Sequence, residues 1–177
     1  MSACPYWPDK RVEDTHILVL IPQTVNKTAL TLNSLEVMLK KPMAGGAATK
    51  YKYFGNDVKK ELGDQGIPNS YWALMTKEVL PCSQGKTFKD QLALIEEPYS
   101  VPEVLELVTG ILMHYVKSGQ RLFPYIPNTY SRCLERVGIN QENVLVGSFS
   151  SSGLSVYGCY GAGNYERCSG LCVVRKL

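Results

Sequence analysis

The segment from Ser100 to Gly119 constrains the fold most strongly, because it predicts a long helix whose apolar side must be covered by other parts of the chain. Ser100 and Glu103 have the spacing of a capping box, Pro102 suits the first turn, and Gly119 supplies a stop signal. The apolar stripe comprises Val101, Val104, Leu105, Val108, Ile111, Leu112 and Tyr115. We expect this helix to lie at the centre of the hydrophobic core.

Four segments predict β-strands around that helix. The apolar run from Ile17 to Ile21 ends at Pro22 and is typical of a buried strand. The aromatic and apolar stretch from Ser70 to Thr76 lies between Pro68 and Pro81 and predicts a central strand. Near the C-terminus, residues 144–149 and 154–159 predict two paired antiparallel strands.

Further helices are predicted from apolar spacing and end signals. They cover residues 30–39 with a capping box at Asn33 and Glu36, residues 51–62 with a left-handed stop at Gly63, a short helix after Thr87 capped toward Asp90, and a short helix at residues 129–137. Together these elements predict a single α+β domain. Its helical N-terminal and middle part packs on a small mixed sheet that the C-terminal antiparallel strands complete. Residues 1–16 are predicted as an N-terminal extension and residues 17–177 as the domain.

Composition favours a soluble globular protein with one core. The chain has 177 residues, of which 45% are hydrophobic and 20% charged, and a chain of this length buries enough surface to be stable alone. The net charge is +3 and the 19 basic residues are spread along the chain, which predicts no nucleic-acid partner. The apolar runs are shorter than the roughly 18 residues that span a bilayer. We expect no membrane span.

The N-terminus and the cysteines predict a cytoplasmic location. The first ten residues have neither a basic opening nor an apolar stretch of signal-peptide length. A chain of this size does not need disulfides, so its six cysteines are interpreted mainly as free thiols of a reducing compartment.

A cysteine-dependent hydrolase or transferase is one functional hypothesis. Cys82 or Cys133 would be the nucleophile and His114 the base, since His16 is the other histidine in the chain. However, His114 lies beside the apolar stripe of the long helix, where a structural role is more common. We therefore assign no catalytic residue.

Two further motifs are interpreted as structural features and not as functional sites. Cys159, Cys168 and Cys172 lack the paired spacing of zinc knuckles, so we expect no metal site there, while a disulfide between Cys159 and Cys168 stays open. The sequence from Gly85 to Thr87 resembles part of a phosphate-binding loop, but Leu80 occupies the position of its first glycine. It is interpreted as a turn with a helix cap, and no cofactor is predicted.

Tyrosines suggest a binding surface in the C-terminal part. Tyr157, Tyr160 and Tyr165 cluster around a glycine-rich turn, and tyrosine provides large contact area at little entropic cost. These three residues are the predicted binding residues, with ordinary strand and turn residues as the alternative. The first functional hypothesis is therefore a protein-interaction module.

Several short motifs together resemble a family of uncharacterised modules in effector-like proteins of chlamydia-like intracellular bacteria of amoebae, where they accompany leucine-rich-repeat, F-box or U-box segments. The matching segments are residues 48–51, 71–81, 129–133, 146–149, 153–156 and 175–176. The resemblance implies a module of unknown biochemical function rather than an enzyme of known reaction, directed at host machinery and delivered into a host cell. It carries over no site residue. The C-terminal cysteines are more numerous than in that family.

Overall fold

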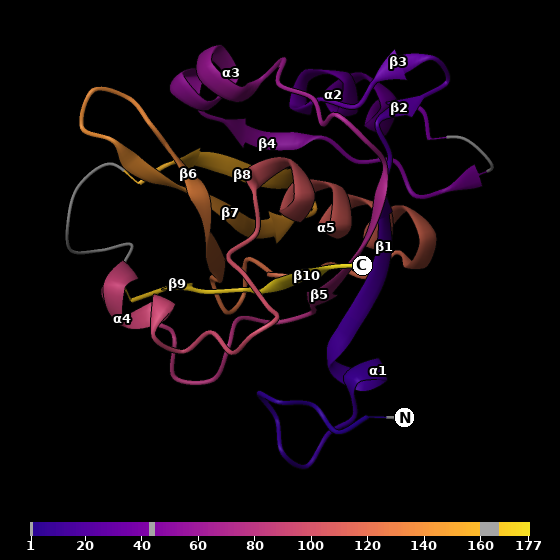
Figure 1. The fold of residues 1–177 in the computed structure, drawn as a ribbon. Helices are drawn as coiled ribbons and strands as arrows, with labels where there is room; N and C mark the ends of the chain where they lie inside the picture. The colour runs from indigo at the N-terminus through magenta and orange to yellow at the C-terminus, as the bar shows by residue number, and fades with distance from the viewer. Residues whose placement is uncertain (1, 43–44, 160–166) are drawn as a thin grey trace.

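The computed structural model describes residues 2–42, 45–159 and 167–177 (Figure 1). Its helices are α1 (Val12–Thr15), α2 (Leu32–Lys40), α3 (Asn56–Leu62), α4 (Phe88–Leu92) and α5 (Val104–Ser118). Its strands are β1 (His16–Ile21), β2 (Thr24–Val25), β3 (Thr28–Ala29), β4 (Tyr51–Phe54), β5 (Tyr71–Thr76), β6 (Tyr130–Val137), β7 (Glu142–Ser150), β8 (Gly153–Gly158), β9 (Ser169–Gly170) and β10 (Val174–Lys176). The predicted α+β class is confirmed.

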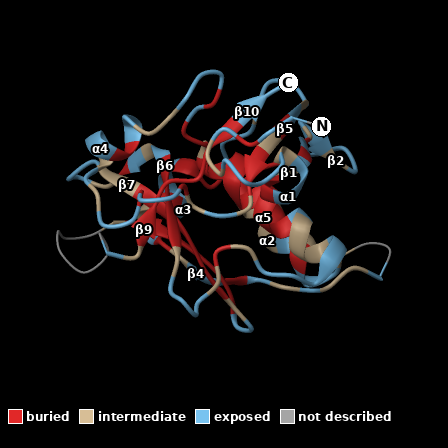
Figure 2. Cartoon of the chain, turned by 90° about the horizontal axis from the view of Figure 1, so that it is seen from below, coloured by how far each residue is buried: buried red, intermediate tan, exposed pale blue. Residues whose placement is uncertain are grey.

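Helix α5 lies at the centre of the core, as its apolar stripe predicts. It contacts β1 of one sheet and β6 and β7 of another, and it runs through the middle of the molecule (Figure 1). Its residues Leu107, Val108, Ile111 and Leu112 have no exposed surface. Buried residues gather along α5 and the strands facing it (Figure 2). One continuous apolar cluster extends along the chain from Val19 to Val174, which agrees with a single domain.

The ends of α5 differ in part from the prediction. The N-cap is Glu103, whose backbone N–H donates to the Glu106 carboxylate at 2.7 Å, so the capping box begins three residues later than expected. Ser100 instead exchanges backbone hydrogen bonds with Val174 at 2.8 and 2.9 Å. Gly119 confirms the stop, since its φ of +72° is left-handed and its N–H donates to the Tyr115 carbonyl.

Two sheets flank α5. The larger sheet has the strand order β4-β8-β7-β6-β9, and β7 pairs with β8 in antiparallel fashion, which confirms the predicted C-terminal pair. Its outer pairs β4–β8 and β6–β9 are parallel, so the sheet is mixed. The smaller sheet has the order β1-β5-β10 and is antiparallel throughout. The predicted early strand and the predicted central strand are therefore confirmed.

The predicted helix at residues 129–137 is wrong, because this segment is β6. It lies between β7 and β9, forming an antiparallel hairpin with β7, which follows it directly, and a parallel pair with β9, which is distant in the sequence. The Ser131 hydroxyl also accepts a hydrogen bond from the backbone of Cys172 at 2.8 Å. Strand preference depends on such neighbours more than on local sequence.

The predicted helix at residues 51–62 is wrong in its first part. Tyr51–Phe54 form β4 beside β8, and the Gly55 N–H donates to the Val156 carbonyl at 2.8 Å before α3 begins. Gly63 ends α3 with a right-handed φ of −54°, not in the predicted left-handed conformation. A Cβ at Gly63 would lie 2.2 Å from the Lys59 carbonyl, so this position needs glycine for close packing.

Of the two other predicted N-terminal caps, the one of α4 is confirmed and the one of α2 is wrong. Thr31 caps α2 and accepts a hydrogen bond from the Ser34 N–H at 3.0 Å, so the predicted box at Asn33 and Glu36 is wrong. Thr87 caps the short α4 and accepts from the Asp90 N–H at 3.2 Å, as predicted.

The predicted N-terminal extension packs on the rest of the chain. Cys4 is buried, and the ring of Tyr6 stands edge-on to that of Tyr99 at 5.4 Å. The Lys77 ammonium group donates to the carbonyls of Glu13 and Asp14 at the end of α1. None of the described helices has the length and apolar character needed to cross a bilayer.

Candidate functional site

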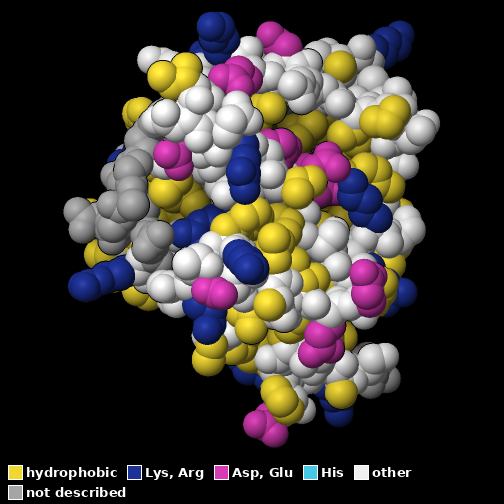
Figure 3. Space-filling model, turned by 60° about the vertical axis from the view of Figure 1, so that its left-hand side comes forward, with side chains coloured by type: hydrophobic (Ala, Val, Ile, Leu, Met, Phe, Trp, Pro, Cys, Tyr) yellow, Lys and Arg dark blue, Asp and Glu magenta, His cyan; other side chains and the backbone are white. Residues whose placement is uncertain are grey.

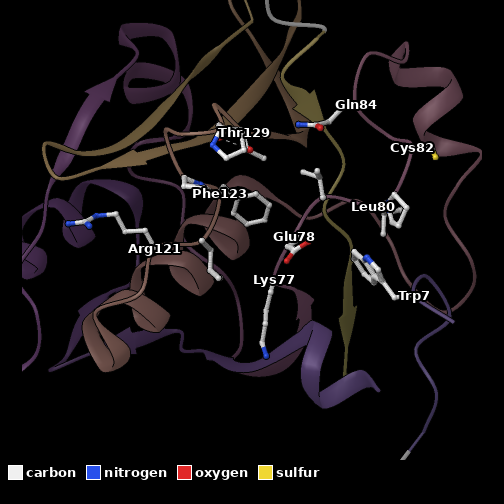
Figure 4. A pocket seen from close by; sticks show the side chains of 14 residues that line it. Trp7, Lys77, Glu78, Leu80, Cys82, Gln84, Arg121, Phe123 and Thr129 are labelled. Carbon is white, nitrogen blue, oxygen red and sulfur yellow. Dashed lines mark hydrogen bonds between the residues drawn. The ribbon is translucent and has the colours of Figure 1, made fainter. Parts of the chain in front are cut away.

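A hollow of about 720 Å³ lies between the segment after β5 and the segment after α5 (Figure 4). It is lined by Trp7, Lys77, Glu78, Val79, Leu80, Pro81, Cys82, Gln84, Arg121, Leu122, Phe123, Pro124, Pro127 and Thr129. Its walls are mainly apolar, and three segments far apart in sequence contribute to them. Its size falls within the range of small-molecule sites in proteins.

The charged residues of this hollow differ in how they are paired. The Lys77 ammonium group is bound to the carbonyls of α1 at 2.9 and 3.0 Å. Arg121 donates to the Tyr115 hydroxyl at 3.2 Å and lies 5.0 Å from the centre of that ring. No ion pair or hydrogen bond holds the Glu78 carboxylate among the described residues. In Figure 4 this carboxylate lies toward the middle of the hollow, whereas Lys77 and Arg121 extend away from it.

Two residues of the hollow have a left-handed backbone without being glycine. Phe123 has a φ of +50° and Cys82 a φ of +58°, a conformation that costs about 1–2 kcal/mol for such residues. Phe123 is held in place because its carbonyl accepts from the Phe149 N–H at 2.9 Å and Tyr125 donates back to Phe149 at 3.2 Å. Such conformations occur preferentially at binding and active sites.

A second candidate surface is the outer face of the sheet β1-β5-β10, which points away from α5. Leu20 lies opposite Trp72 in the register, and the Leu177 N–H donates to the Trp72 carbonyl, so these three residues form one row. Leu18 and Arg175 lie on either side of Leu74 in the next row. The exposed fractions of Leu18, Leu20, Trp72 and Leu177 are 58%, 41%, 49% and 60%.

One end of this face is covered and the rest is open. The His16 ring lies 5.5 Å from that of Tyr99, which covers the row at the start of β1. Beside it is a hollow of about 560 Å³ lined in part by Leu18, Leu74, Tyr99 and Arg175. Arg175 is exposed, and none of the described acidic groups forms an ion pair with it. The face therefore combines an open apolar area with a cation at its margin.

Other parts of the surface mix charges of both signs. On the face shown in Figure 3, hydrophobic side chains occupy the middle, and single basic and acidic side chains are scattered around them. That face has no stripe of basic side chains such as nucleic-acid binding requires.

The predicted tyrosine site is only partly described. Tyr160 and Tyr165 lie outside the described residues. Tyr157 is 9% exposed, and its ring stands edge-on to those of Tyr53 and Tyr130 at 5.6 Å each. Little of the Tyr157 ring is therefore available to a partner.

The candidate cysteine nucleophiles lie in different surroundings. Cys133 is fully buried, and burial together with the nearby Glu135 carboxylate raises the pKa of its thiol well above the ordinary value. Such a thiol does not ionise near neutral pH. Cys82 is exposed beside the larger hollow. Across the described residues, no hydrogen bond joins a cysteine to His114, and burial lowers the pKa of that histidine.

The metal and phosphate motifs have structural roles where the chain is described. No group of three or more potential metal ligands occurs there. Cys159 and Cys168 pack beside Tyr130, Leu145 and Tyr157. Gly85 has a φ of +74° in the turn before α4, and the Lys86 carbonyl accepts from the Arg132 guanidinium at 2.9 Å. The turn and cap interpretation agrees with this geometry.

Comparisons with protein-family models, curated proteins and solved structures find no match for this chain. Apart from Cys82, which lines the larger hollow, both candidate surfaces consist of residues that the sequence analysis did not select as functional. The sequence does not reveal which residues of β1 and β5 are exposed, because both strands have apolar residues on both faces. The larger hollow has no local motif, since its walls come from three segments.

Proposed function

We propose that this chain is a protein-interaction module that binds its partner through the outer face of the sheet β1-β5-β10. The open row formed by Leu20, Trp72 and Leu177 is the observation that carries this proposal. A contiguous apolar area on a soluble protein is typical of an interface, and tryptophan is enriched among the residues that dominate binding energy.

The partner that fits this face is an amphipathic segment with a carboxylate beside its apolar side chains. Arg175 is the charged residue among those that point outward from the three strands. A carboxylate on the partner would pair with Arg175, while apolar side chains cover Trp72 and Leu18. A second copy of the same face offers no carboxylate from its strands, and Glu13 of α1, which lines the hollow beside Arg175, pairs with Arg11 at 3.5 Å. Complementarity of charge therefore favours a different protein.

The cellular setting is also proposed. Free thiols at Cys4, Cys82, Cys133 and Cys172 support a reducing compartment such as the cytoplasm. The resemblance to modules of effector-like proteins supports delivery into a host cell and a partner in host machinery. A module of this kind needs no catalytic residue.

Selection from a library of random peptides on the intact chain tests the proposed face. We expect selected peptides to combine apolar residues with Asp or Glu, and Trp72→Ala to weaken their binding at least about 10-fold because it removes the centre of the interface. Arg175→Glu is expected to shift selection toward basic peptides. Binding is measured by isothermal titration calorimetry.

Ile139→Ala is the matched control, because Ile139 is 99% exposed and lies in the turn between β6 and β7. Its variant should bind the selected peptides like the wild type. Peptides that bind equally well to Trp72→Ala would place the interface elsewhere. A concentration-dependent dimer that Trp72→Ala abolishes would contradict the assignment of an acidic partner.

A further inference from the structure

We propose that the hollow between the segments after β5 and α5 binds an apolar organic cation, with the Glu78 carboxylate as its counter-charge. The ligand class is an aryl-alkyl or alkyl ammonium group, free or on a side chain. This site is separate from the outer face of the smaller sheet. It therefore adds a binding activity to the proposed interaction module.

The walls of the hollow favour an apolar ligand body. Leu80 and Phe123 are buried residues that line the hollow, and the partly buried Trp7 lies beside Leu80, across the hollow from Phe123 (Figure 4). Ligand sites are typically concave and apolar, with a few polar groups that set orientation. An indole ring in the wall also favours a cation, because the face of the ring is electron-rich.

The distribution of charge selects a cation over an anion. Lys77 and Arg121 line the hollow, but their charged groups extend away from its middle, and each donates to a residue outside the lining (Figure 4). Arg121 stacks over the rings of Tyr115 and Phe149 at 5.0 and 5.6 Å, and Lys77 closes the end of α1. Glu78 is the remaining charged side chain of the lining. A carboxylate beside apolar walls pairs strongly with a bound ammonium group, because the ligand shields the pair from water.

The backbone of the hollow is fixed before any ligand binds. Phe123 keeps its left-handed conformation through the backbone hydrogen bonds with Phe149, and Ser83, next to Cys82, is buried and donates to the Leu80 carbonyl at 2.7 Å. A preformed site lowers the ordering cost of binding. Strain retained at Cys82 and Phe123 on the two sides of one hollow agrees with a binding role.

Three probes of similar shape and different charge test the ligand class. They are 2-phenylethylamine, 2-phenylethanol and 3-phenylpropionate, titrated at pH 7 into the intact chain and followed by NMR chemical shifts. Ligands of this size are expected to bind in the millimolar range. We expect the amine to bind about 10-fold more tightly than the alcohol, and the carboxylate to bind most weakly.

Glu78→Gln should remove the preference for the amine while leaving the binding of the alcohol unchanged. Glu97→Gln is the matched control, because Glu97 is also exposed and lies outside the hollow. Trp7→Ala should weaken the binding of the amine and of the alcohol. Equal affinities for amine and alcohol, an unchanged preference in Glu78→Gln, or no saturable shift of residues in the hollow would each overturn the proposal.

Discussion

Gly147 and Gly85 show how the space around a single residue decides the effect of a substitution. Both have a positive φ, +154° and +74° respectively. A Cβ at Gly147 would lie 2.3 Å from the Thr129 carbonyl oxygen and 2.8 Å from the Cα of Tyr130. A Cβ at Gly85 would meet no atom within 4 Å. Alanine is strained by the backbone at both positions, and at Gly147 its Cβ is also crowded.

We predict that Gly147→Ala lowers the free energy of unfolding by about 3 kcal/mol, because β7 must move away from the start of β6. Gly85→Ala should lower it by only about 1 kcal/mol, the cost of a left-handed alanine. Urea denaturation followed by circular dichroism measures both. Equal effects at the two positions would show that crowding at Gly147 is relieved without cost.

At the scale of elements, a buried hydrogen-bond network joins α5 to the smaller sheet. Glu106 is 1% exposed, and its carboxylate accepts from the Tyr71 hydroxyl at 2.6 Å and pairs with the Lys176 ammonium group at 3.0 Å. Burial and the Glu106 carboxylate raise the pKa of Tyr71, so its hydroxyl stays a donor. Helix α5, β5 and β10 are thereby fixed to one another.

Tyr71→Phe is expected to destabilise the chain by about 2 kcal/mol, because it removes a donor from a buried carboxylate and leaves the packing of the ring unchanged. Tyr53→Phe is the control, since Tyr53 is exposed, and it should change stability by less than about 0.5 kcal/mol. Thermal and urea unfolding of the two variants provide the comparison. A Tyr71→Phe variant as stable as the wild type would mean that water replaces the lost donor.

How much of each element the sequence predicted depends on where its partners lie. Helix α5 and β1 follow local patterns, and both were predicted close to their observed bounds. The segment of β6 has no strong pattern of its own and becomes a strand because β7 and β9 pair with it. Tyr51 and Phe54 have the spacing of residues on one face of a helix, but their segment pairs with β8 and forms a strand. In both cases backbone pairing with other strands outweighs the local helical spacing, and β4–β8 and β6–β9 are pairs between distant segments.

At the scale of the whole molecule, the stability of the fold depends on pH through its buried histidine. His16 is 3% exposed, and burial together with the Lys77 charge lowers the pKa of its ring. Its Nδ1 lies 2.9 Å from the Thr15 hydroxyl, and its Nε2 has no hydrogen-bond partner. Below pH 6.5 the unfolded chain therefore binds a proton that the folded chain excludes.

We predict that stability falls as the pH drops below about 6.5 toward the lowered pKa of His16, with a slope of at most about 1.4 kcal/mol per pH unit from this group. His16→Asn keeps a polar group near Thr15 and should remove that part of the slope. Urea unfolding of both proteins between pH 8 and pH 5 measures the difference. The difference cancels the contributions of His114 and Glu135, which both proteins share. A constant difference across this range would rule out a titrating His16.

The candidate sites, like β4 and β6, depend on contacts between distant segments and could not be predicted from local sequence patterns. Trp72 is visible in the sequence as part of a strand, but its exposure depends on the absence of a covering layer over that face of the sheet. Glu78 and Trp7 are 71 positions apart and share one hollow only because the N-terminal segment packs beside the chain after β5. No local motif indicates either site.

The sequence by itself determined the α+β class, the long core helix, the two strands around Val19 and Ala73, and the C-terminal pair of strands. Each of these is specified by apolar spacing and end signals within about 20 residues, and such patterns act through local geometry. Only the tertiary structure decided that β4 and β6 are strands, that Tyr157 is buried, and that Trp72 and Glu78 lie at open sites. These features depend on which distant segments meet, and that is set by packing over the whole molecule.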